Sequence, residues 1–400
     1  MLLLSAVLYI NKAIYYKPTI QISESDTINM DVLRQLRHLK HKMAAGAADD
    51  MQGLYPEGYI FMHALYGLAW CDFASGLTPN SSLYKEAQEE ISKSCVALQL
   101  PKARAIFDEN LTIPNGAFYA GWSSYLLGKK LSLEKASERN AEEVKYFQQQ
   151  CAWIAEAFTN YTSPYPESYY QAAWPADAMV CAASLRLHDK IFAPQYSNVL
   201  YTWIDKVKKT FDTRGLIPHR TDPVTGQPRE GARGSSQSLM LIFLHEIEPE
   251  FGKQQFDIYK NNFPDERLGL PGICEYPRGV IGAGDVDSGP VIFQMGAAAS
   301  IVGIRTLATY HETSRACGIQ GGIEAFGFST HDEDEKEYIF GILPMADVFI
   351  TWAQTAIPIE AYSKTIADRS RFHLYSAVVL IIIIASLIIQ WRDKLRRKQA

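Results

Sequence analysis

The sequence predicts an all-α protein: an (α/α)6 toroid of six outer–inner helical hairpins, followed by one C-terminal transmembrane helix. Three observations lead to this prediction. Charged amphipathic segments alternate with segments that are apolar on nearly every face. The apolar segments recur at near-constant intervals, and a long uncharged run lies near the C-terminus. Hydrophobic residues make up 47% of the chain and charged residues 21%, which is typical of a globular protein.

The N-terminal stretch, residues 1–20, begins MLLLSAVLYI and has the apolar length of a signal-peptide core. It has no basic residues ahead of the apolar run and no clear A-x-A cleavage motif. We therefore interpret it as a signal sequence or the remnant of a longer anchor.

Residues 21–365 are expected to form the toroid domain, in which two kinds of helix alternate. The outer kind is amphipathic and charged, and it is predicted at 28–43, 82–98, 134–158, 195–211, 252–263 and 313–327. The inner kind is rich in Gly, Ala and Ser, and it is predicted at 57–75, 115–128, 170–187, 233–248, 287–309 and 345–357. A helix that is apolar all round must be buried on all sides, so one-faced helices are expected to cover it from outside.

The C-terminal run LYSAVVLIIIIASLIIQW, residues 374–391, carries no charge and is followed by RDKLRRK. This length approaches what a helix needs to span a bilayer. We predict a transmembrane helix over 372–391 and a basic cytoplasmic tail over 392–400. If the chain is exported, the body is extracytoplasmic, which is the prediction we adopt. Without export the protein is tail-anchored and its body faces the cytosol.

The predicted starts of the inner helices are regularly spaced. The markers are Glu57, Asn115, Trp174, Arg233, Asp287 and Met345, and their intervals are 58, 59, 59, 54 and 58 residues. A period in this range indicates a repeated supersecondary unit. Six hairpins that cannot each bury an inner helix alone close most simply into a ring.

In this layout the chain resembles the six-hairpin glycosidase superfold over most of residues 28–357. The resemblance rests on architecture, and no motif identifies one glycosidase family. The same superfold also includes polysaccharide lyases, sugar epimerases and enzymes of the linalool dehydratase-isomerase type, so the fold alone does not decide the function.

The stretch GAGDVDSGP at 282–290 places Asp285 and Asp287 directly before a predicted inner helix. In a ring of parallel inner helices the six N-termini meet at one end, and helix N-termini favour negative charge. Asp287 could also be an N-cap, but Asp285 lies too far out to serve that same cap. We expect a working carboxylate here, with its pKa lowered by the helix dipole.

Similar residue types lie just before or within the first turns of the other inner helices, with Trp122 about two turns inside the second. The expected catalytic carboxylates are Asp285, Asp287, Asp177, Glu57 and Glu230. The expected substrate-binding residues are Tyr55, Trp122, Trp174, His219, Arg233, Glu275 and Tyr276. Asp347, in the first turn of the sixth predicted inner helix, is placed less favourably.

Carboxylates beside Trp, Tyr, His and Arg fit glycoside hydrolysis, in which one acid protonates the leaving oxygen and a second carboxylate activates water or attacks the sugar. We therefore predict a membrane-anchored glycoside hydrolase acting on a small-molecule or oligosaccharide substrate. Two alternatives stay open. One is a lyase, epimerase or dehydratase-isomerase on the same ring; Cys274 beside Glu275 would suit the dehydratase-isomerase. The other is a non-catalytic glycan-binding protein.

Other chemistries find little support in the sequence. There is no HExxH motif, no P-loop and no GxSxG elbow, and the six cysteines have no zinc-like spacing. We therefore expect no metal and no cofactor. The net charge of −5, without a basic cluster in the body, argues against nucleic acid as a partner.

Overall fold

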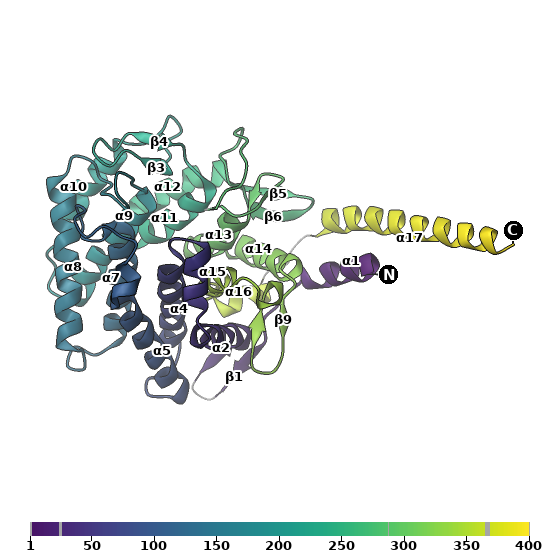
Figure 1. Cartoon of the computed structure of the whole chain (residues 1–400), viewed down its shortest axis with the longest axis horizontal. Helices are drawn as coiled ribbons and strands as arrows, with labels where there is room; N and C mark the ends of the chain where they lie inside the picture. The colour runs from purple at the N-terminus through teal and green to yellow at the C-terminus, as the bar shows by residue number, and fades with distance from the viewer. Residues whose placement is uncertain (1, 24–25, 287, 365–368, 400) are drawn as a thin grey trace.

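Six inner helices form a closed ring in the computed structural model, which describes residues 2–23, 26–286, 288–364 and 369–399. Each inner helix packs against the next, and the sixth returns to the first (Figure 1). In ring order they are α4 (Gly58–Ser75), α7 (Gly116–Leu133), α9 (Pro175–Ile191), α11 (Gly234–Ile247), α13 (Ala297–Thr309) and α15 (Pro344–Gln354). The outer helices are α2 (Met30–Ala44), α5 (Ser82–Gln99), α8 (Ala141–Asn160), α10 (Ser197–Lys208), α12 (Pro249–Asn262) and α14 (Thr313–Phe326). The (α/α)6 toroid is thereby confirmed.

The predicted inner helices match the observed ones except at the starts of the third and the fifth. The third was predicted from 170 but begins at Pro175, because the chain turns at the bridge between Tyr169 and Ala172. The first four begin one residue after their predicted markers, and the sixth begins one residue before its marker. The fifth begins at Ala297 and not at Asp287, so the prediction of a helix from 287 was wrong. A short hairpin, β7 (Val291–Ile292) paired with β8 (Met295–Gly296), occupies part of the intervening segment.

Outer and inner helices begin differently. Three outer helices carry side-chain N-caps: Asn29 accepts hydrogen bonds from the backbone at the start of α2, Ser81 at α5 and Asn140 at α8. No inner helix has a side-chain cap of this kind. The residues that precede inner helices are therefore available for other contacts.

Glycines let neighbouring inner helices approach closely. A Cβ atom on Gly121 of α7 would lie 3.1 Å from the Val180 Cβ of α9, and one on Gly128 would lie 2.7 Å from a Leu187 methyl group. A larger side chain at either position would force the two helices apart.

Aromatic side chains fill the interior of the ring. The Trp122 ring lies 5.5 Å from Phe61, 5.8 Å from Phe243 and 6.2 Å from Trp352, measured between ring centroids. Trp122 itself is 0% exposed. We call these four residues the aromatic plug; its edge-to-face packing adds to the burial that stabilises the ring.

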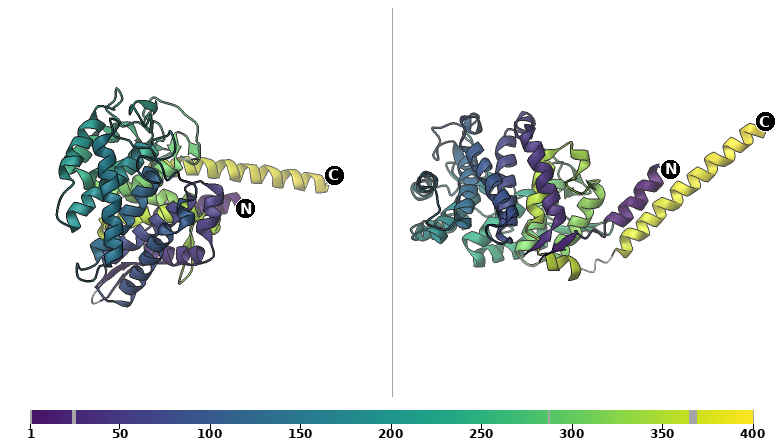
Figure 2. Two further views of the ribbon diagram at one scale, coloured as in Figure 1. Left: turned by 60° about the vertical axis from the view of Figure 1, so that its left-hand side comes forward. Right: turned by 90° about the horizontal axis from the view of Figure 1, so that it is seen from below.

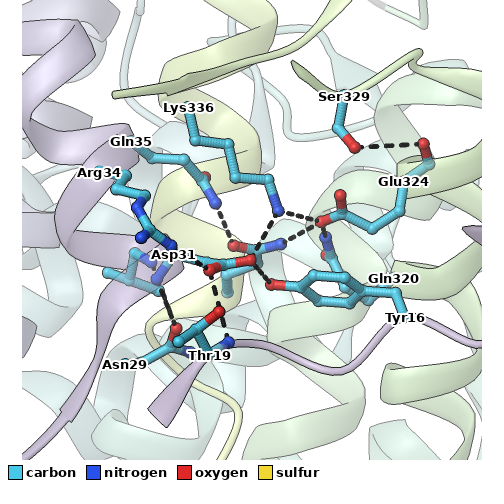
Figure 3. Close-up of polar contacts among 12 residues, drawn as sticks. Tyr16, Thr19, Asn29, Asp31, Arg34, Gln35, Gln320, Glu324, Ser329 and Lys336 are labelled. Carbon is cyan, nitrogen blue, oxygen red and sulfur yellow. Dashed lines mark hydrogen bonds and ion pairs between the residues drawn. The ribbon is translucent and has the colours of Figure 1, made fainter. Parts of the chain in front are cut away.

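A buried polar cluster joins the first and last hairpins of the ring (Figure 3). The Lys336 ammonium, 2% exposed, lies 3.1 Å from Asp31 of α2 and 2.9 Å from Glu324 of α14. The Tyr16 hydroxyl donates to Asp31 at 2.9 Å, and the Lys336 Nζ lies 4.3 Å from the centre of the Tyr16 ring. This cluster therefore holds the segment after α1 against the body.

Short elements complete the body. The remaining helices are α3 (Ala47–Leu54), α6 (Pro101–Arg104), α16 (Ile359–Lys364) and the 3₁₀ turn η1 (Ile339–Gly341). The other antiparallel pairs are β1 (Ile20–Ile22) with β2 (Thr27–Asn29), β3 (Arg220–Thr221) with β4 (Pro228–Glu230), β5 (Pro264–Arg267) with β6 (Leu270–Ile273), and β9 (Thr330–His331) with β10 (Lys336–Glu337).

The two terminal helices, α1 (Leu2–Ala13) and α17 (Ser370–Gln399), lie side by side and leave the body on one side (Figure 2). The Asn11 amide donates to the Ser376 hydroxyl at 2.5 Å, and the Tyr15 hydroxyl lies 2.6 Å from the His373 ring. Within α17, residues 370–396 are long and apolar enough to cross a membrane by length and composition.

Candidate active site at the mouth of the ring

The residues just before four inner helices gather where those helices begin. Glu57, Asn115, Trp174 and Arg233 are the N-cap residues of α4, α7, α9 and α11, yet none of their side chains accepts a hydrogen bond from its own helix. The connections around them contact one another: the Ala117 amide donates to the Glu167 carbonyl, and the Gly234 amide donates to the Glu275 carbonyl. These segments form the mouth of the ring.

A row of contacts crosses the mouth from the first hairpin to the fourth. The Glu57 carboxylate accepts a hydrogen bond from the Tyr169 hydroxyl. The Tyr169 ring lies edge-on to Trp174 at 5.5 Å, and the Arg220 guanidinium lies 5.3 Å from the centre of the Trp174 ring. Arg220 in turn lies 3.5 Å from the Glu230 carboxylate. We call these five residues the mouth row; it brings two predicted carboxylates and one predicted aromatic residue into one connected set.

The side chains of the mouth row differ in how exposed they are and in how firmly their backbone is held. Trp174 is half-buried and is followed by Pro175, which fixes the first turn of α9. Arg220 and Glu230 lie on the paired strands β3 and β4, and Glu230 is exposed. The predicted residues Asp177 and His219 are buried nearby: Asp177 lies in the first turn of α9, and the His219 amide donates to the Glu230 carbonyl at 3.2 Å.

Arg233 holds two predicted carboxylates in a second cluster. Its guanidinium donates twice to Asp285, at 2.6 and 2.8 Å, and once to Glu275 at 2.8 Å. The Ser235 hydroxyl also donates to Glu275, whose side chain is 0% exposed. Asp285 additionally accepts from the Ser288 amide, which closes its loop. Asp285 is therefore engaged as a loop anchor.

The charge states in this cluster follow from burial and pairing. The bidentate hydrogen bonds from Arg233 hold the pKa of Asp285 well below its usual range. We expected a lowered pKa at Asp285 but assigned it to a helix dipole; α13 begins only at Ala297, so the cause is Arg233. Burial raises the pKa of Glu275, although Ser235 and Arg233 act in the opposite direction.

Several predicted residues are not part of the mouth row. Trp122 is part of the aromatic plug and packs in the interior. Tyr276 supports the Arg233 cluster: Arg233 lies 5.8 Å from the centre of its ring, and its hydroxyl donates to the Ala283 carbonyl. Tyr55, half-buried, ends α3. Asp287 lies outside the described residues.

Two further groups from the sequence argument are also buried. Burial raises the pKa of the Cys274 thiol, which disfavours the nucleophilic thiolate. Asp347 accepts a hydrogen bond from the Tyr338 amide, so it faces the segment that joins α14 to α15. Burial raises the pKa of Asp347 to about 7. Neither group belongs to the mouth row.

Two members of the mouth row were not among the predicted site residues, Tyr169 and Arg220. Tyr169 adjoins the predicted Trp174 in the segment YPESYYQAAWPAD, and an isolated bridge between Tyr169 and Ala172 turns the chain there. Arg220 lies beside His219, but only the pairing of β3 with β4 places it opposite Glu230. Within the described ranges, no group of three or more His, Cys, Asp or Glu side chains could hold a metal ion.

Comparison with known proteins gives structural likeness alone. No protein-family model matches the chain, and no curated protein matches it. Among solved structures it is similar to an unsaturated glucuronyl hydrolase specific for heparin, with 11% identity over 90% of this chain and 95% of that one, at a TM-score of 0.46. It is also similar to a D-mannose isomerase, with 13% identity over 90% of this chain and 98% of that one, at a TM-score of 0.42.

Proposed function

We propose that this protein is a membrane-anchored carbohydrate-active enzyme that hydrolyses a glycosidic bond at the mouth of the ring. The observation that carries the proposal is the mouth row, in which Glu57 and Glu230 lie at the two ends of a connected set with an aromatic platform between them. Hydrolysis of a glycoside needs two carboxyl groups that flank the bond, and aromatic faces commonly hold sugar rings.

In this proposal Glu57, Asp177 and Glu230 supply the acid and the base. Trp174 holds a sugar ring, and Arg220 with His219 binds hydroxyl or acidic groups of the substrate. Arg233, Glu275, Asp285 and Tyr276 act as positioning residues: Arg233 joins the two carboxylates, and the Tyr276 hydroxyl donates to the Ala283 carbonyl beside them. Asp287 stays a predicted catalytic carboxylate.

The anchor in this proposal is α17. Its uncharged stretch crosses the bilayer, the basic tail stays in the cytoplasm, and the body is extracytoplasmic. The support is the apolar length of the helix and the exposure of its Val, Ile and Leu side chains along that length.

A substrate screen with matched variants tests the catalytic proposal. The full chain is assayed in detergent or nanodiscs against oligosaccharides and aryl glycosides, together with Glu57→Gln, Asp177→Asn and Glu230→Gln. Two of these should lower kcat/KM by roughly 100-fold or more at unchanged Tm, which is the usual size of a lost general acid or base. Glu89→Gln, on the exposed side of α5, is the control and should match the parent.

Other outcomes would refute the proposal. If the parent binds sugars but turns over none of the panel, the protein is a glycan-binding protein. If all three variants keep parental turnover, the mouth row is not the active site.

A further inference from the structure

Apolar side chains are exposed at loop tips on the side of the body from which α1 and α17 leave. They are Leu268, Ile292, Phe293, Phe328, Phe340 and Ile342, and we call them the docking face. They come from three hairpins or turns: β5–β6, β7–β8, and the β9–β10 region with η1. Exposed apolar residues that gather on one side commonly mark an interaction surface.

The backbone at these loop tips has positive φ angles, which are unfavourable for the bulky residues found there. Leu268 has φ 52° and Phe293 has φ 51°, each as the first central residue of a two-residue hairpin turn. Asn, Asp or Gly is preferred at such positions, and a bulky side chain there is strained. Phe328 and Phe340, with φ 46° and 56°, repeat the pattern. Large apolar residues at strained, exposed positions indicate that their side chains have a use.

One part of the docking face adjoins the start of α17. A Cβ atom on Gly269, next to Leu268, would lie 2.4 Å from the Phe372 amide nitrogen, so this hairpin tip abuts the helix. The Arg267 guanidinium donates to the Phe293 carbonyl at 3.2 Å, which ties the second tip to the first. Leu268 and Phe293 therefore lie beside the base of the predicted anchor.

The other part reaches farther along the anchor. The Phe328 ring stacks on Tyr9 of α1, with centroids 6.1 Å apart, and Phe340 stacks on Phe328 at 6.3 Å. The Asn11 side chain of α1 contacts Ser376 of α17. Tyr9 lies two residues farther from the body than Asn11, and two residues of a helix span about 3 Å. Because α1 and α17 are antiparallel, Tyr9 lies beside the residues of α17 that follow Ser376. Phe328, which stacks on Tyr9, is therefore at the same height along α17, inside its uncharged run 374–391.

Contacts of the segment after α1 also fix the two terminal helices relative to the body. Ile14 of the segment after α1 packs with Ala325 and Phe372, and the Ile14 carbonyl lies against Gly321 of α14. Tyr16 belongs to the buried cluster around Lys336 (Figure 3). The helices are thus fixed to the body, and the docking face stays at the same level beside them.

We infer that the docking face rests in the bilayer surface, with its Phe, Leu and Ile side chains in the boundary between headgroups and acyl chains. This inference rests on the proposed anchoring by α17, because it is the position beside the uncharged run that selects lipid as the occupant. Apolar groups at this boundary gain free energy by leaving water, as those of interfacial helices do.

Site-specific fluorescence in the full chain tests the inference. Cysteine variants Phe328→Cys and Phe293→Cys, in a Cys317→Ala parent whose other cysteines are buried, are labelled with NBD and placed in phosphatidylcholine nanodiscs. Doxyl-labelled lipid should quench both probes about twofold or more, because apolar faces at this boundary are buried ~5–10 Å into the region between headgroups and acyl chains. The control Val96→Cys, exposed on α5, should not be quenched.

A fourth probe separates the two proposals. Ile382→Cys lies in the middle of the uncharged run of α17. If Ile382→Cys is quenched while the probes at 328 and 293 behave like the one at 96, the anchor stands and the docking face is refuted. If Ile382→Cys is not quenched either, the anchoring itself is wrong. A probe at 328 that is shifted to the blue but insensitive to doxyl lipid indicates a second protein copy on this face and also overturns the inference.

Discussion

Arg233 shows how strongly a single residue depends on its partners. It is buried between Glu275, which is fully buried, and Asp285, which is partly exposed. Removing one member of a buried ion pair leaves an uncompensated charge in the interior, and the cost is about 3–5 kcal/mol. We therefore expect Arg233→Gln to lower Tm sharply in thermal unfolding.

The matched control for Arg233 is Lys253→Gln. Lys253 pairs with Asp257 at 2.8 Å on the outside of α12, where both side chains are exposed. Exposed pairs contribute at most about 1 kcal/mol. Equal Tm values for the two variants would contradict the anchoring role of Arg233.

Asp347 predicts a pH dependence of stability. Its pKa is raised to about 7 by burial, so between roughly pH 4 and 7 the folded protein holds a proton that the unfolded chain has lost. The contribution of this group to the free energy of unfolding is therefore full below about pH 4, falls between about pH 4 and 7, and levels off above about pH 7. Asp347→Asn keeps an acceptor for the Tyr338 amide and cannot ionise.

Thermal unfolding between pH 5 and 8 checks this expectation. Tm of Asp347→Asn relative to the parent should rise with pH. A constant difference across that range would show that Asp347 is ionised in the folded protein.

For single residues, the sequence predicts which residue types lie at the mouth better than it predicts which side chains contact one another. Glu57, Trp174 and Arg233 were identified because each directly precedes an apolar helix. The pair Arg233–Asp285 joins residues 52 positions apart, and no local pattern indicates which carboxylate an arginine selects. Trp122, about two turns inside the second inner helix, was expected to bind substrate, but its ring packs in the aromatic plug.

Among the elements, the periodicity predicted the start of the fifth inner helix wrongly, at 287 and not at Ala297. The residues VIFQMG at 291–296 are as apolar as the helix that follows, so composition does not separate them. Gly289 and Pro290 were the available signal, since both disfavour a helix interior. The turn at Phe293 and Gln294 completes a hairpin despite residues that rarely occupy it.

The turn of β7–β8 gives a prediction at the scale of one element. Gln294 has φ 71°, and its side-chain oxygen is buried without a hydrogen-bond partner among the described residues. Gln294→Gly removes both penalties and should raise the free energy of unfolding by about 1 kcal/mol, measured by chemical denaturation.

The control substitution runs in the opposite direction. Gly289 has φ 62°, and a Cβ atom there would meet nothing closer than 3.8 Å, so Gly289→Ala adds backbone strain without a clash. It should destabilise by a similar amount. A loss of stability in Gln294→Gly would mean that the Gln294 side chain makes a contact of its own.

For the whole molecule, the ring could be predicted because each inner helix must be covered on every side. This requirement produces the alternation and the period that the sequence displays, and both survive without any family motif. The hairpins β5–β6 and β9–β10 and the buried cluster at Lys336 left no such periodic trace, because each occurs once.

A protease-protection experiment tests the membrane topology of the whole chain, that is, on which side of the membrane the body and the basic tail lie. With a C-terminal epitope on intact cells, added protease should digest the body and leave the epitope intact, because the basic tail is expected in the cytoplasm. An intact body on such cells, with digestion only after lysis, would favour the tail-anchored arrangement.

The aromatic plug limits how a substrate can move. Trp122, Phe243 and Trp352 are almost completely buried where a channel through the ring would run. The plug therefore fills the interior of the ring, so a polymer chain cannot thread through it. Under the proposed function, substrate therefore arrives and product leaves on the same side of the ring, so the enzyme would release one chain end before it takes the next.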